Sequence, residues 1–99
     1  MMTSITRERA EMGITHNDFR RIFPRLLTTA TEMQIGLQSE ISWGTTRKLK
    51  VEVSAEFVRK IALLRLPYVH IHFEFQGFTD AGADEFMANF DRAFHKGGG

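Results

Sequence analysis

The chain has 99 residues, of which 42% are hydrophobic and 25% are charged, and its formal net charge is +1. This length and composition are typical of one globular domain and exclude collagen-like, disordered and multi-domain chains. The absence of cysteine excludes a disulfide framework, a thiolate metal site and a cysteine nucleophile, and it fits a reducing, cytoplasmic compartment.

The amino-terminal residues are polar and mixed in charge, without an apolar period, so residues 1–13 are predicted to be a loosely ordered leader. They lack the apolar core of a signal peptide, and no run of about 18 apolar residues could span a bilayer. We therefore expect neither secretion nor a membrane partner. Residues 14–96 are predicted to form the single domain, followed by a flexible glycine tail at 97–99.

A first helix is predicted after Thr15, which can cap its amino end. Its apolar residues recur at helical spacing and form one stripe: Phe19, Ile22, Phe23, Leu26 and Leu27. Pro24 lies within this stripe and removes an amide donor, so we expect a kink or a break into two short helices.

From Met33 to Trp43 the apolar residues alternate with polar ones, which predicts one half-buried strand. A turn at Gly44 follows, and alternation resumes from Leu49 to Val53. The two segments are therefore predicted to pair as a hairpin.

Ser54 can cap the next segment, and residues 55–66 are strongly apolar. A short helix is the leading interpretation here, with a strand left open as the alternative. Pro67 ends this segment, and the alternation over 69–76 gives the clearest strand pattern of the chain. A last amphipathic helix is predicted after Thr79 or Asp80.

These elements predict an α+β fold of two layers in the order α-β-β-α-β-α, with helices covering one face of a three-stranded sheet. The sheet is expected to be antiparallel. A mixed sheet stays open, because the sequence does not determine where the third strand pairs.

The other face of that sheet is expected to be polar and to contain candidate ligands. His70, His72 and Glu74 share one face of a strand, and two imidazoles in an HxH pattern can bind one metal ion. A polar strand face exposed to water is the simpler explanation, and spacing identifies no further ligand. We therefore assign no metal, no cofactor and no catalytic residue, and keep these three residues as metal candidates only.

Basic residues on the first helix and the hairpin could bind phosphate groups if they converge; they are Arg20, Arg21, Arg25, Arg47, Lys48 and Lys50. The outward positions of the predicted strands contain no aromatic residue on which bases could stack. Nucleic acid is therefore a disfavoured partner.

Two further features have competing explanations. The ending Gly97-Gly98-Gly99 resembles the tail of ubiquitin-like carriers, but here it follows a helix and is explained as a helix end. Phe78 precedes the last helix, where it can pack against the first turn or serve as an exposed interaction anchor.

The favoured function is that of a small cytosolic, non-enzymatic protein-binding or adaptor module, whose partner is another protein or a second copy forming a homodimer. The alternatives are a metal- or small-ligand-binding protein and a nucleic-acid-binding module. The predicted interaction residues are Gln38, Glu40, Lys48, Lys50, His70, His72, Glu74 and Phe78.

Overall fold

The computed structural model describes residues 4–95. The first helical segment begins as its sequence predicts. The Thr15 hydroxyl accepts a hydrogen bond from the Asp18 amide, the Asp18 carboxylate accepts one from the Thr15 amide, and the two bonds cap helix α1 (His16–Ile22). At Pro24 the backbone tightens into the 3₁₀ helix η1 (Phe23–Leu26). The predicted break into two short helices is confirmed.

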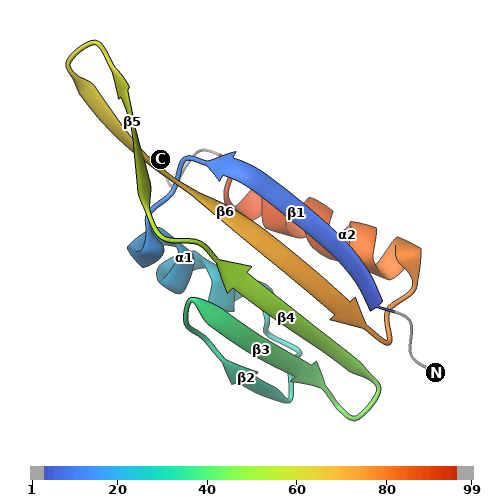
Figure 1. Cartoon of the computed structure of the whole chain (residues 1–99). Helices are drawn as coiled ribbons and strands as arrows, with labels where there is room; N and C mark the ends of the chain where they lie inside the picture. The colour runs from blue at the N-terminus through green and yellow to red at the C-terminus, as the bar shows by residue number, and fades with distance from the viewer. Residues whose placement is uncertain (1–3, 96–99) are drawn as a thin grey trace.

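An antiparallel sheet of six strands forms the other layer (Figure 1). Its strands are β1 (Ser4–Met12), β2 (Glu32–Gln34), β3 (Gln38–Trp43), β4 (Arg47–Val53), β5 (Phe57–Ile61) and β6 (Leu64–Gln76). Five of them are ordered β1-β6-β4-β3-β2, and β5 pairs with the beginning of β6. The α+β class is thus confirmed, whereas the three-stranded sheet and the predicted order of elements are wrong.

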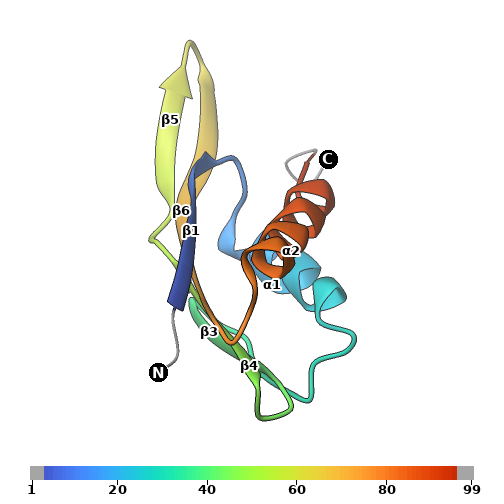
Figure 2. The same cartoon turned by 90° about the vertical axis from the view of Figure 1, so that its right-hand side faces the viewer.

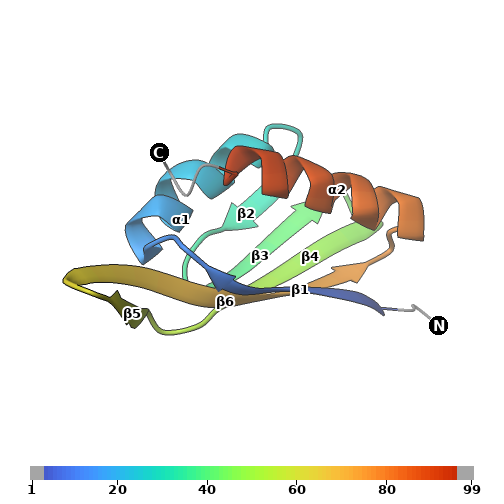
Figure 3. The same cartoon turned by 90° about the horizontal axis from the view of Figure 1, so that it is seen from above.

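Both helical segments lie on the same face of the sheet (Figures 2 and 3). Helix α2 (Asp80–Ala93) begins at Thr79, whose hydroxyl accepts a hydrogen bond from the Gly82 amide. The core between the layers contains aromatic residues of both, including Phe19, Phe73 and Phe90. One face of the sheet is therefore covered by helices, and the opposite face, called here the outward face, is left open.

Strand β1 occupies residues expected to be a loosely ordered leader. It pairs with β6 from Ser4 to Met12. Its period is hidden in the sequence because Arg7 and Arg9 occupy the positions that face the helices, where they form ion pairs with Asp84 and Asp91 of α2 at 3.0 and 2.8 Å. A charged residue at an inward position removes the apolar alternation by which a strand is recognised.

The predicted single strand over 33–43 is a hairpin of β2 and β3. The chain reverses near Gly36, where the Ser39 hydroxyl donates a hydrogen bond to the Gly36 carbonyl (2.9 Å) and accepts one from the Gly36 amide (3.1 Å). Ile35 and Leu37 in this turn still pack against the core. Apolar residues in a partly buried turn thus extended the strand pattern beyond the real strand.

The helix predicted over 55–66 is wrong, and the strand alternative is right. This segment contains β5, a turn of two residues and the beginning of β6. Strand β6 therefore has 13 residues and begins before Pro67, not after it. The glycine tail at 97–99 lies outside the described residues.

Candidate functional site

A two-stranded hairpin, residues 57–68, projects from one end of the sheet and is called here the arm; the remainder of the sheet is the body (Figure 1). Strand β5 pairs with β6 in the register Phe57 to Tyr68, Arg59 to Leu66 and Ile61 to Leu64. Strand β1 pairs with β6 only from Val69 onward. Both long edges of the arm therefore lack a neighbouring strand within the described chain.

The arm begins where the pairing of β4 with β6 is interrupted. The Ser54 amide donates a hydrogen bond to the His70 carbonyl, and the Ser54 hydroxyl accepts one from the His70 amide, both at 2.9 Å. Helix α1 supports this junction, because the His16 ring nitrogen Nε2 lies 2.8 Å from the Ser54 carbonyl oxygen. The base of the arm is thus fixed to the body, while the tip extends beyond both helices (Figure 3).

Large apolar side chains are exposed along the arm, which is unusual for a domain with a well-filled core. Leu63 at the tip is 100% exposed, Leu64 is 62% exposed, and Val58, Ile61, Phe57 and Leu66 are between 44% and 54% exposed. A contiguous exposed apolar area of this kind marks an interaction site in soluble proteins. The arm is therefore the strongest candidate for a contact surface.

The two faces of the arm differ in chemistry. Alternation along the paired strands places Phe57, Ile61, Leu64, Leu66 and Tyr68 on one face, together with Arg59. We call this the outer face, because it continues the outward face of the body: Phe57 and Tyr68 both contact the His70 ring, with centroids 5.7 Å away. The opposite face contains Val58, Lys60, Arg65 and Pro67.

The only charge on the outer face belongs to Arg59, and it is already partnered. Its guanidinium lies 5.3 Å from the centroid of the Tyr68 ring and forms an ion pair with Glu11 of β1. Both partners lie toward the base of the arm. The outer face beyond Arg59 is consequently apolar up to the tip.

The body presents a polar outward face. The strand registers place Gln38, Glu40, Lys48, Lys50, His70, His72 and Glu74 on it, so seven of the eight predicted interaction residues share one surface. Lys48 forms an ion pair with Glu40 at 3.3 Å, and His72 Nδ1 lies 3.1 Å from the Glu8 carboxylate. Hydrogen bonds from Gln76 and Ser4 hold the pKa of the Glu74 carboxyl below its usual value.

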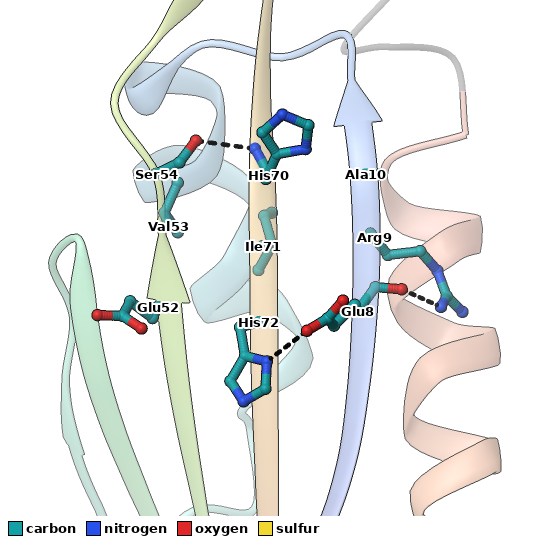
Figure 4. Close-up of a pocket in the computed structure, with 9 residues that line it drawn as sticks. All are labelled: Glu8, Arg9, Ala10, Glu52, Val53, Ser54, His70, Ile71 and His72. Carbon is teal, nitrogen blue, oxygen red and sulfur yellow. Dashed lines mark hydrogen bonds and ion pairs between the residues drawn. The ribbon is translucent and has the colours of Figure 1, made fainter.

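A shallow depression of about 500 Å³ lies on this face between β1, β6 and β4 (Figure 4). Glu8, Glu52, His70 and His72 are among its lining residues. The metal candidates His70 and His72 have protein partners here: His70 Nδ1 accepts a hydrogen bond from the Glu11 amide (3.2 Å), and His72 contacts Glu8. Among residues 4–95 no group of three or more His, Asp or Glu side chains is arranged to hold a metal ion.

Phe78 lies away from this surface. It packs edge-on against Trp43 and Phe75, with ring centroids 5.5 and 5.0 Å apart, and Arg47 lies over its ring. Phe78 is one of the partly buried residues that pack against the core. It therefore belongs to a corner of the core and not to the outward face.

The basic residues considered for phosphate binding lie on different layers. Arg20, Arg21 and Arg25 belong to α1 and η1, whereas Lys48 and Lys50 lie on the outward face of β4. Arg21 is also paired with Asp18. These cations do not form one basic patch.

The arm is not the leading prediction from the sequence, because its apolar residues suggest a buried helix. The three basic residues Arg59, Lys60 and Arg65, together with Pro67 inside the strand, were the available signal, since a buried element would contain fewer charges.

No protein-family model matches the chain, and no curated protein or solved structure is detectably similar to it. Within residues 4–95 no helix is long and apolar enough to cross a membrane.

Proposed function

We propose that this chain is a small cytosolic, non-enzymatic protein-binding module that contacts its partner with the outward face of the sheet, anchored by the arm. The observation that carries the proposal is the exposure of the apolar arm residues, with Leu63 and Leu64 the most exposed. Removing apolar surface from water favours association by about 25 cal/mol per Å². The arm is therefore the part of the described chain where contact with a partner would remove the most apolar surface from water.

The polar outward face complements the arm in this proposal. Protein interfaces combine an apolar centre, which supplies most of the binding energy, with a polar rim that determines orientation. Along β6 one row of side chains changes from Leu64, Leu66 and Tyr68 on the arm to His72 and Glu74 on the body. This continuity supports one surface with an apolar anchor and a polar flank.

Site-specific photo-cross-linking tests the proposal in the intact chain. A benzophenone amino acid at position 63 should give discrete cross-linked protein species in cells, because the Leu63 side chain is fully exposed at the tip. The same probe at Asn89, on an exposed position of α2, is the matched control. If position 63 gives only the cross-linked species that the control also gives, the proposal is wrong.

Two double variants then separate the arm from the body. Leu64→Thr with Leu66→Thr keeps β-forming residues on the arm but removes its apolar contact, and it should abolish the cross-link. Lys48→Glu with Lys50→Glu reverses the exposed charges of β4 and should weaken the same cross-link while circular dichroism shows an intact fold. An unchanged cross-link in the second variant would remove the body from the proposed surface.

A further inference from the structure

We infer that the partner of the arm is a second copy of the chain, and that two arms stack outer face against outer face about a two-fold axis beside Leu66. This inference rests on the role of the arm in the proposed function and specifies the arm's partner. It differs in one respect: the outward face of the body lies outside the contact of two arms, so Lys48→Glu with Lys50→Glu should leave this dimer intact. A two-fold interface requires a surface that is complementary to itself. The outer face meets this requirement, because Phe57, Ile61, Leu64 and Leu66 are exposed and apolar, and its one exposed charge, Arg59, is paired with Glu11 of the same chain.

The chemistry of the two halves of the outward face favours contact of arm with arm. Apart from Glu11, whose charge is compensated by Arg59 of the arm, the body presents five carboxylates, Glu8, Glu32, Glu40, Glu52 and Glu74, against two ammonium groups, Lys48 and Lys50, a formal balance of −3. Placing an apolar arm over this surface would remove charges from water without partners, which is costly. Stacking two arms leaves these charges in water.

The same charges determine the relative direction of the two arms. If the arms pointed the same way, the bodies would also face each other, and two surfaces of −3 would approach. Antiparallel arms place the bodies at opposite ends of the dimer. Tyr68 of one copy then lies opposite Leu64 of the other, and the two Leu66 side chains meet beside the axis.

Arg59 shares the row of Leu66, so this arrangement also brings the two Arg59 residues near the axis. Their charges do not meet, because Glu11 and Tyr68 hold each guanidinium toward the base of its own arm. In the antiparallel dimer the two bases lie at opposite ends. The ion pair of Arg59 with Glu11 thus compensates the one charge within the apolar face.

The available area predicts a weak dimer. With roughly 180 Å² for a fully exposed large apolar residue, the outer face and the Leu63 tip offer about 550 Å² per copy. Two copies would bury about 1,100 Å², just below the range of about 1,200–2,000 Å² for stable interfaces. A dissociation constant in the micromolar range is expected.

Sedimentation velocity of the purified chain from about 5 to 500 μM tests the inference. Wild type should pass from monomer to dimer, and Leu64→Thr with Leu66→Thr should weaken the dimer about thirtyfold or more. The matched control is Lys60→Thr with Arg65→Thr, which makes two changes on the opposite face of the same arm and should leave the dimer intact. A wild type that stays monomeric, or a control that weakens the dimer as much as the test variant, overturns the inference.

Single cysteines test the geometry, since the chain has none of its own. Leu66→Cys, near the axis, should form an interchain disulfide under mild oxidation, and Lys60→Cys should not. Equal cross-linking of both positions contradicts the stacked arrangement. The two proposals can fail separately. If the protein is monomeric but position 63 still gives a larger, arm-dependent cross-linked species, the arm binds a different protein and only the inferred dimer is wrong. If position 63 gives no such species, both proposals are wrong.

Discussion

Gly77 is predicted to accept no side chain without a backbone shift, because its backbone lies close to the β3–β4 turn. Its φ is +78°, and a Cβ atom added to it would lie 1.8 Å from the Thr46 carbonyl oxygen and 3.0 Å from the Thr46 carbonyl carbon. Non-bonded heavy atoms normally stay about 3.5 Å apart. Gly77→Ala must therefore displace the backbone by more than 1 Å, next to the last pair of the β4–β6 ladder, Lys48 with Gln76.

Gly44 provides the matched control for this change. Its φ is +63°, close to that of Gly77, but an added Cβ meets nothing within 4 Å. Both Gly→Ala changes incur about 1–2 kcal/mol for a left-handed backbone, and both recover about 0.4–1 kcal/mol from the stiffer unfolded chain. These terms cancel in the comparison, which leaves the contact with Thr46.

The displacement at Gly77 should break one or two ladder hydrogen bonds at about 1 kcal/mol each and disturb the packing beneath them. We expect Gly44→Ala to lower the free energy of unfolding by about 0.5–1 kcal/mol, and Gly77→Ala by about 2 kcal/mol more. Urea unfolding followed by circular dichroism and by fluorescence of Trp43, the single tryptophan, measures both. Equal losses for the two variants would refute the steric argument.

Two smaller effects follow from the cap of α1 and the turn of the arm. The Thr15 amide, with help from Arg21, holds the pKa of the Asp18 carboxyl below its usual value, so Asp18 stabilises the fold at neutral pH, and this contribution disappears as the pH falls through the lowered pKa. Asp18→Ala should therefore reduce the free energy of unfolding by about 1 kcal/mol at pH 7 and by much less once the pH is below the lowered pKa of Asp18, and a pH-independent difference would contradict this explanation. Ala62 has a φ of +54° in the two-residue turn, so Ala62→Gly should stabilise the arm by about 0.5 kcal/mol; this predicts an approximately twofold slower amide exchange at the tip, and faster exchange would count against it.

The sequence predicts the elements that alternate cleanly or have a cap. Thr15 and Thr79 mark the starts of α1 and α2, Pro24 marks the break after α1, and Gly44 lies in the β3–β4 turn. In each case a local interaction within a few residues determines the backbone. Local patterns are sufficient where local physics decides the structure.

The elements that the sequence does not predict depend on distant partners. Arg9 can occupy an inward position in β1 only because Asp91 of α2 accepts two of its hydrogen bonds, each 2.8 Å long. The arm likewise becomes a hairpin through pairing between β5 and β6, although its apolar composition is also compatible with a helix. The outward polar residues are predictable one strand at a time, but their meeting on one face requires the strand order.

The arm dominates the proposed interface because its exposed apolar side chains, unlike the paired polar side chains of the body, have no hydrogen bonds or ion pairs within the described chain to give up. On the body, Lys48, Glu40, His72 and Glu8 already have partners within the chain, so a binding protein would only exchange one set of polar contacts for another, and exposed ion pairs contribute little energy. On the arm, the apolar side chains have water as their neighbour, and every contact made there removes apolar area from it. Changes at Leu64 or Leu66 should therefore alter how tightly any partner of the arm is held, whereas changes at Lys48 or Lys50 should alter only the orientation and association rate of a partner that also contacts the body.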